Sequence, residues 1–558
     1  MGVRRRRFRR RRVLASRSRS RPSPLAFARQ PRAAPKPSVT DRPLWIRNAN
    51  DAFERAAHRA ARRRRTGART TTMHSHAMRA RAPRPRAPAR ASTLESARRA
   101  RGDGTGRRAI GRVSRRATRG ASAATRAHGD VDLLNHLGKK RVVITGMGAV
   151  TAHGDDVDEM YEKLCRGESA ITTIDKWDTG EIGTKFAGEI KAFDCGDYMN
   201  KKMARRVDPY IAYMIVAAKR ALESAKVNWN DESGEHYVDK ALSGCLIGSA
   251  MGGMQTFATA TENLVTQGHR KMNPFCIPFA ITNMGSALTA MDIGFMGPNY
   301  SIASACATGN FCILNSIMHI QNGEANLMLA GASDAAVIPI GMAGFSAAKA
   351  LSTRNDDPAA ASRPWDANRD GFVMGEGAGV LVLESLESAL ARGAPIVAEV
   401  LGGFATCDAH HMTEPRPDGV GVNFAIDKAL EITGVKAEDV NYINAHATST
   451  PAGDMAELRV LQKKFKASGA KINSTKSLIG HLLGAASAVE AVVCIKAITS
   501  GEVHPNKNLD TPDEGVDTSM LVGTTREKLD VKVALSNSFG FGGHNSAVLF
   551  APYKPKRS

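Results

Sequence analysis

The chain contains 558 residues, with 78 lysines and arginines against 54 aspartates and glutamates, a formal net charge of +24. Residues 1–138 hold 38 basic and 7 acidic residues, a net charge of +31. The remaining residues, 139–558, hold 40 basic and 47 acidic residues, a net charge of −7. The basic charge therefore belongs to the amino-terminal segment, and net charge excludes a nucleic-acid-binding core.

The cysteines and the uncharged stretches exclude two further classes. No two cysteines are spaced as CxxC, and a body of about 420 residues has ample core without disulfides, so we expect reduced thiols and no metal site. Residues 241–261 and 293–323 carry no charge, but Gly and Ser interrupt both stretches, and Pro and Asn also interrupt the second. They are typical of a buried core or a subunit interface, and we expect no membrane insertion.

Residues 1–138 are rich in Arg, Ala, Ser and Pro and poor in acidic and aromatic residues. Such a segment buries too little apolar surface to offset its chain entropy, so we expect it to be disordered. The composition favours an organelle-targeting presequence. A basic nucleic-acid-binding tail, or a start at Met73 or Met78 with a shorter presequence, are the alternatives.

The body alternates short β-rich runs with longer helical patterns, which predicts an α/β fold of two halves with buried sheets. The runs predicted as strands are 141–146, 246–248, 300–303, 327–330, 379–383, 396–400, 442–444 and 533–535. The patterns predicted as helices are 209–225, 309–322, 385–392, 422–433 and 482–499.

The first candidate for chemistry is Cys306, in the run Ser-Ala-Cys-Ala-Thr-Gly between a predicted strand and a predicted helix. A thiol at a helix amino terminus faces the positive end of the helix dipole and unpaired backbone N–H groups. Both features favour the thiolate, and the same N–H groups can hold an oxyanion. A small buried hydrophobic residue is the alternative reading of Cys306.

Two histidines follow in similar settings. His446 ends a predicted strand in Asn-Ala-His-Ala-Thr-Ser-Thr, at the carboxyl edge where ligand sites of α/β sheets lie. His481 follows Gly480 and precedes a helix of small residues, and Lys476 is placed to orient it. A satisfied core histidine and a solvated lysine are the alternative interpretations.

Residues 537–545 form a glycine-rich loop that contains Phe539 and Phe541. Such a loop can bring a backbone N–H group close to a reacting centre, or it can let an aromatic ring move as a gate. A tight turn between two strands is the alternative.

These four motifs, in this order and spacing across residues 139–558, resemble the elongating β-ketoacyl-[acyl-carrier-protein] synthases of types I and II. The ending Gly-Phe-Gly-Gly-His-Asn-Ser is similar to the plant and algal plastid branch. A thiolase would need a second cysteine near the carboxyl terminus, an initiating type III synthase would carry Asn in place of His481, and a non-catalytic chain-length factor would lack Cys306.

The resemblance implies a thiolase-like fold, in which two similar halves form α-β-α-β-α layers. We expect the first half at residues 139–395, with the nucleophilic cysteine, and the second at residues 396–558, with both histidines. It further implies decarboxylative condensation of acyl-carrier-bound acyl and malonyl groups in fatty acid elongation. No cofactor is implied beyond the phosphopantetheine of the acyl-carrier protein. A homodimer in the plastid is expected, with the mitochondrion as the alternative location.

The resemblance also implies a role for each site residue. Cys306 carries the acyl group, His446 and His481 stabilise the enolate, and Lys476 orients His481. The remaining implied roles are oxyanion donation and gating by Phe541 and Phe539, support by Asp454 and Glu457, and substrate binding by Thr448, Thr450 and Met251. Two departures from the usual pattern are Ser304, often Thr, and the pair Ser487-Ala488, often Gly-rich.

Overall fold

The structure is a computed structural model that describes residues 132, 134–230 and 234–556. The predicted presequence lies outside the described residues, except for its last few positions. Among these, Asp132 accepts a hydrogen bond from the Arg141 guanidinium through its backbone carbonyl (2.7 Å). The ordered body is therefore tied to the chain just before residue 139.

One nine-stranded sheet runs through the described body in the order β4-β5-β6-β1-β7-β13-β12-β8-β9. Its strands are β1 (Val142–Val150), β4 (Ser243–Gly248), β5 (Leu327–Asp334), β6 (Gly377–Ser385), β7 (Ala398–Cys407), β8 (Tyr442–Asn444), β9 (Lys471–Asn473), β12 (Ala534–Gly540) and β13 (His544–Ala551). Two small two-stranded sheets pair β2 (Thr172–Thr173) with β3 (Phe186–Ala187) and β10 (Glu502–Val503) with β11 (Glu527–Lys528).

The large sheet contains the same pairing pattern twice. In the first half β4 and β5 are parallel, and β6 is antiparallel to both β5 and β1. In the second half β8 and β12 are parallel, and β13 is antiparallel to both β12 and β7. The halves meet where β1 and β7 pair over three residues. We propose that they divide at residues 395 and 396, in the connection that precedes β7.

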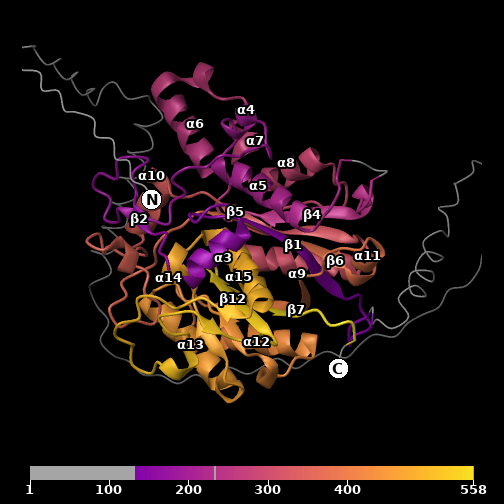
Figure 1. The fold of residues 1–558 in the computed structure, drawn as a ribbon. Helices are drawn as coiled ribbons and strands as arrows, with labels where there is room; N and C mark the ends of the chain where they lie inside the picture. Colours follow the sequence, from indigo (N-terminus) through magenta and orange to yellow (C-terminus); the bar gives the residue numbers. More distant parts are fainter. Residues whose placement is uncertain (1–131, 133, 231–233, 557–558) are drawn as a thin grey trace, which may run out of the picture. The chain divides into compact units, whose positions relative to one another are not determined.

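The helices complete five layers (Figure 1). Helices α5 (Pro209–Ser224) and α8 (Asn283–Ile293) cover the outer face of the first half-sheet, and α12 (Val420–Thr433) and α13 (Pro451–Phe465) cover that of the second. Between the half-sheets lie α9 (Thr308–Gln321) and α15 (Ala486–Ser500). The α/β class and the thiolase-like layering predicted from the sequence are confirmed.

The remaining helices are shorter or lie at the periphery. They are α3 (Val157–Cys165), α4 (Lys201–Ala204), α6 (Met254–Gln267), α7 (Cys276–Ala280), α10 (Pro339–Ala347), α11 (Leu386–Ala391) and α14 (Lys476–Ile479). Helix α6 extends away from the layers beside α7 (Figure 1), and Ala260 is its one buried side chain.

The alternation of side chains along each strand builds the layers. In β5, Leu327 and Leu329 join the apolar cluster under α5, whereas Met328 and Ala330 join the central cluster with α9 and α15. Strands that are apolar on both faces must be covered on both, which is why the sequence shows continuous apolar runs.

The two central helices cross in close contact at Gly309. A Cβ atom on Gly309 of α9 would lie 2.6 Å from the backbone nitrogen of Ala488 on α15, so only glycine fits there. The Ser487 hydroxyl accepts a hydrogen bond from the backbone N–H of Asn310 (3.1 Å). The unusual Ser487-Ala488 pair therefore fits this crossing.

Helix α15 and the turn before it, Leu483–Ser500, are long and apolar enough to span a membrane. However, 78% of this window is buried, because both half-sheets pack on it. A helix that is apolar on all sides is typical of a protein core as well as of a membrane span.

The predicted strand at residues 300–303 is wrong. The chain pairs with β4 at a single bridge, between Asn299 and Cys245, and then leaves the sheet edge. It turns sharply at Ala305, whose φ of 48° is a left-handed conformation. The β-branched and aromatic composition predicted an extended chain but not whether that chain had a hydrogen-bonding neighbour.

Candidate active site

Cys306 sits on a strained turn directly before α9. The backbone of Ala305 adopts the left-handed conformation that non-glycine residues rarely take, and α9 begins two residues after the cysteine, at Thr308. The turn is held against β12: a Cβ atom on Gly540 would lie 2.7 Å from the Ser304 carbonyl oxygen and 3.0 Å from the Cys306 nitrogen. Gly540 therefore lets the carboxyl end of β12 reach the cysteine.

His446 lies two residues beyond the end of β8, and its backbone is fixed by a buried carboxylate. Glu457 on α13 accepts hydrogen bonds from the backbone N–H groups of His446 and Ala447, each at 2.8 Å. The ring Nδ1 lies 3.4 Å from the hydroxyl of Ser538 on β12. Glu457 thus holds the main chain at His446, while the His446 ring faces the cavity.

His481 follows α14 and Gly480, whose φ of 74° turns the chain toward Cys306. The His481 Nε2 lies 2.9 Å from the Cys306 Sγ. The two imidazole rings meet edge to face, with centroids 5.4 Å apart. The Sγ and one ring nitrogen from each histidine all lie within 4.8 Å of one another. Three motifs separated by up to 175 positions therefore converge on one point.

Lys476 is buried and forms an ion pair with Glu490 on α15. No contact joins the Lys476 ammonium to His481; within the described residues its effect on both histidines is through its charge. Burial lowers the pKa of His446 and of His481 well below the usual 6.5 and is the larger cause. The positive charge of Lys476 lowers both pKa values further. Both imidazoles are therefore neutral at physiological pH.

Burial opposes the thiolate that the helix amino terminus favours at Cys306. Burial raises the pKa of this thiol to about 12, although Lys476 and the backbone N–H groups of Phe541 and Cys306 act in the opposite direction. The desolvation of a charged sulfur outweighs the local dipoles here. Cys306 is a neutral thiol with two N–H groups directed at its sulfur.

A cavity of roughly 610 Å³ opens over the three residues. Nine of the eleven predicted site residues line it: Met251, Cys306, His446, Thr448, Thr450, Glu457, His481, Phe539 and Phe541. The other two, Asp454 and Lys476, lie behind its wall. The sequence motifs therefore mark one site.

Aromatic rings close two sides of the cavity. The Phe539 ring packs edge to face on His446, with centroids 5.5 Å apart, and the Phe372 ring packs similarly on His481 at 5.4 Å. The Phe541 side chain is 39% exposed and lies 6.4 Å from the Phe345 ring. Of these rings, Phe541 is the most exposed, and its gating role stays a prediction.

Met251 also lines the cavity, and its position depends on Asp334 at the end of β5. The Asp334 carboxylate accepts hydrogen bonds from the backbone N–H groups of Ala250 (3.2 Å), Met251 (3.0 Å) and Gly484 (2.7 Å). It thereby joins the Met251 loop to the chain just after His481. Burial raises the pKa of Asp334 to about 6.

Asp334 and Glu490 are residues that the sequence analysis missed. Glu490 was detectable as the one carboxylate within an otherwise apolar helix, since a charge on such a helix needs a buried partner. Asp334 gave a weaker signal, an acid at the end of a buried strand.

Comparison with known proteins places the chain in a family. Models of the beta-ketoacyl synthase amino-terminal and carboxyl-terminal domains match residues 139–389 and 397–510. The chain belongs to the beta-ketoacyl synthase family. The resemblance seen in the sequence is confirmed, and with it the condensing activity of fatty acid elongation and the absence of any cofactor besides the substrate-carrying phosphopantetheine.

The chloroplastic 3-oxoacyl-[acyl-carrier-protein] synthase II of Arabidopsis thaliana is 58% identical over 417 residues, covering 75% of this chain and 76% of the relative. The chloroplastic synthase I of the same plant is 56% identical over 418 residues, covering 75% and 88%. Synthase 2 of Vibrio cholerae is 44% identical over 417 residues, covering 74% and 99%. The plastid location predicted for the chain is confirmed by its chloroplastic relatives.

Two solved structures show the same fold. A beta-ketoacyl synthase from Burkholderia phymatum aligns with a TM-score of 0.69 at 32% identity, covering 74% of this chain and 100% of that one. A ketosynthase in complex with its type II acyl-carrier protein, bound to a hexaketide, aligns with a TM-score of 0.66 at 30% identity, covering 75% and 100%.

The buried Lys476 charge leads to a prediction about the histidines. Replacing Lys476 with Met removes the positive charge that disfavours imidazolium, so the pKa of His446 and of His481 should rise. NMR titration of the labelled histidine rings measures both values. The double variant Lys476→Met/Glu490→Gln, which leaves no unpaired buried carboxylate, should show the same direction. Unchanged or lower pKa values would contradict the electrostatic role of Lys476.

Proposed function

We propose that Cys306 carries the growing acyl chain as a thioester and that His446 and His481 stabilise the enolate that extends it. The convergence of one thiol and two neutral imidazoles in a single cavity is the observation that carries this proposal. A neutral imidazole N–H group is a strong preorganised donor to a developing negative charge.

In the first half-reaction the Cys306 sulfur attacks the thioester carbonyl of the carrier-bound acyl group. The carbon–sulfur bond to the pantetheine breaks, and the thiol proton ends on the departing pantetheine thiol. The backbone N–H groups of Cys306 and Phe541, which face the sulfur in the free enzyme, serve as oxyanion donors to the tetrahedral intermediate.

In the second half-reaction the malonyl thioester loses CO₂. The electron pair of the broken carbon–carbon bond forms an enolate, whose oxygen accepts hydrogen bonds from His446 and His481. The enolate carbon attacks the acyl-Cys306 carbonyl and the carbon–sulfur bond breaks. The released Cys306 sulfur then takes up a proton, which its pKa of about 12 favours strongly.

We propose that three of the residues lining the cavity bind the substrate. Thr448 and Thr450 lie at the same cavity as the reacting groups, with hydroxyls 3.0 Å apart, and suit the amide groups of a phosphopantetheine arm. Met251, in the apolar cluster with Phe345, suits the distal part of the acyl chain. The partner that delivers both is the acyl-carrier protein.

A homodimer is supported by the free edge of the large sheet. Beside β4, residues 296–299 form the bridge at Asn299 and a few backbone hydrogen bonds. In the described part of the chain no strand pairs with residues 300–303, so the backbone groups of this segment form an open edge. Large exposed apolar side chains gather on the elements around it: Met291, Met296, Tyr300 and Met318 are 67%, 72%, 38% and 50% exposed. An open edge with an apolar margin is a pairing surface for a second copy.

The two half-reactions can be separated by mutation. Cys306→Ala should abolish acyl transfer and condensation but retain some malonyl decarboxylation, because the histidines remain. His446→Ala or His481→Ala should lower decarboxylation by roughly two or more orders of magnitude. Mass spectrometry of the acyl-enzyme and measurement of CO₂ release test both. An acyl adduct on another cysteine, or unchanged decarboxylation in both histidine variants, would disprove these roles.

Met251→Phe should shorten the longest acyl chain that the enzyme accepts, because a rigid ring replaces a flexible side chain at the distal end of the cavity. Rates with carrier-bound acyl groups of increasing length give the profile. Equal losses for short and long chains would show that Met251 does not face the acyl chain.

Met296→Glu should weaken self-association, because a carboxylate in an apolar interface must be desolvated without a partner. Sedimentation velocity of the full chain should show dimers for the unaltered protein and an increased monomer fraction for the variant. Met412→Glu, a similarly exposed methionine at 74%, is the matched control. A monomeric unaltered protein would refute the dimer.

A further inference from the structure

The turn that carries the two cavity threonines is strained. Ser449 lies between Thr448 and Thr450 with a φ of 71°, in the left-handed region that non-glycine residues avoid. The Thr448 and Thr450 hydroxyls lie 3.0 Å from each other, and both residues line the same cavity. Strain of this kind persists only where the surrounding structure imposes it.

Two hydrogen bonds from one neighbouring segment fix Ser449. Its hydroxyl accepts a hydrogen bond from the backbone N–H of Arg363 (3.0 Å), and its carbonyl accepts one from the backbone N–H of Gly371 (3.2 Å). Ser449 is fully buried. Residues 363–371 therefore hold both the side chain and the main chain of the strained residue.

The Arg369 guanidinium holds the next two residues of the turn. Its Nε donates to the Thr450 carbonyl oxygen (3.1 Å) and its Nη2 to the Pro451 carbonyl oxygen (2.7 Å). Asp454, which accepts from the Thr450 backbone N–H (3.2 Å), lies 3.5 Å from the same guanidinium. A planar fork of donors can bind two successive carbonyls in a way that an ammonium cannot.

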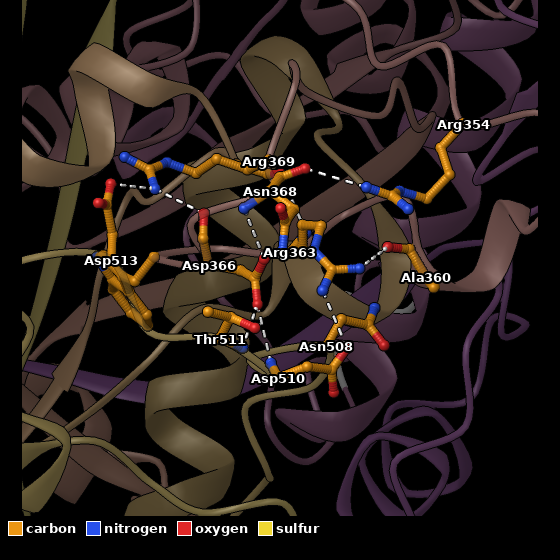
Figure 2. Close-up of polar contacts among 12 residues, drawn as sticks. Arg354, Ala360, Arg363, Asp366, Asn368, Arg369, Asn508, Asp510, Thr511 and Asp513 are labelled. Atoms are coloured by element: carbon orange, nitrogen blue, oxygen red, sulfur yellow. Dashed lines mark hydrogen bonds and ion pairs between the residues drawn. The ribbon is translucent and has the colours of Figure 1, made fainter.

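Carboxylate groups form ion pairs with both Arg363 and Arg369 (Figure 2). Arg369 pairs with Asp513 (2.7 Å). Arg363 pairs with Asp366 and Asp510, each at 2.9 Å. The Asp366 carboxylate also accepts a hydrogen bond from the backbone N–H of Thr511 (2.7 Å), so residues 510–513 bind both arginines and Asp366.

We propose that Ser449 and Arg369 are positioning residues that preset the Thr448 and Thr450 hydroxyls for the pantetheine arm. The proposal rests on the pantetheine-binding role of the threonines in the proposed function. The rigid network keeps the turn in its strained form before substrate arrives, so the arm binds without first ordering its site.

Ser449 offers a matched pair of substitutions. Ser449→Gly loses the hydroxyl but adopts a positive φ freely, whereas Ser449→Val loses the hydroxyl and disfavours a positive φ. The comparison separates the backbone conformation from the hydrogen bond. Arg369→Gln removes the fork, and Arg369→Lys keeps the charge without it. Arg526→Gln, at an exposed ion pair with Glu162, is the control.

The measured quantity is the rate of CO₂ release from two probes, malonyl-pantetheine and malonyl ethyl thioester, which lacks the pantetheine amides. In Ser449→Val and Arg369→Gln the preference for malonyl-pantetheine, expressed as the ratio of kcat/KM values, should fall at least tenfold, mainly through KM. In Ser449→Gly this preference should fall less than threefold. In Arg369→Lys it should fall less than in Arg369→Gln. Arg526→Gln should leave the ratio unchanged.

Thr450→Val separates the pantetheine-binding role of the threonines from the positioning role of Ser449 and Arg369. If Thr450→Val leaves the pantetheine preference intact, the proposed function of the threonines fails, and this inference fails with it. If Thr450→Val lowers the preference but Ser449→Val and Arg369→Gln slow both probes equally, the network is only structural and the positioning role is refuted. Should Arg369→Gln not fold, as thermal unfolding would reveal, the Ser449 pair still decides.

Discussion

The direct crossing of α9 and α15 is the constraint on which the site depends. Because Gly309 has no side chain, α9 contacts the backbone of α15 at Ala488, and the chain ends leading into these helices come together. Cys306 precedes one helix and His481 precedes the other, so their 2.9 Å contact follows from this crossing. A methyl group at residue 309 would separate the nucleophile from the histidine while leaving both side chains chemically intact.

Burial then determines the charge state of the three reacting groups and of Glu457. It keeps both imidazoles neutral and the thiol protonated, and it raises the pKa of Glu457 to about 7 despite two backbone N–H donors. The main full charge near the reacting atoms is Lys476, which Glu490 partly offsets. A site of neutral donors around a neutral thiol is suited to charge that appears only during reaction, since no resident ion competes for the hydrogen bonds.

Around this centre, the rigid parts come from elements far apart in sequence. Asp334 ties the Met251 loop to the chain after His481, Glu457 fixes the His446 backbone, and Arg369 holds the turn at Thr450. Each of these supports acts through backbone N–H or carbonyl groups. Backbone hydrogen bonds of this kind give no periodic signal in the sequence, which explains why Asp334 and Arg369 were not identified from it.

The sequence by itself determined the α/β class, the approximate places of most strands and helices, and the four motifs, because periodicity and local composition are properties of short segments. The family resemblance that these motifs carry also identified nine residues that line one cavity. Only the tertiary structure decided that residues 300–303 pair with no strand in the described chain, that burial raises the pKa of Cys306, that Lys476 pairs with Glu490, and that Ser449 is strained. Each of these depends on which distant segment packs alongside, and that depends on how the two halves close around α9 and α15.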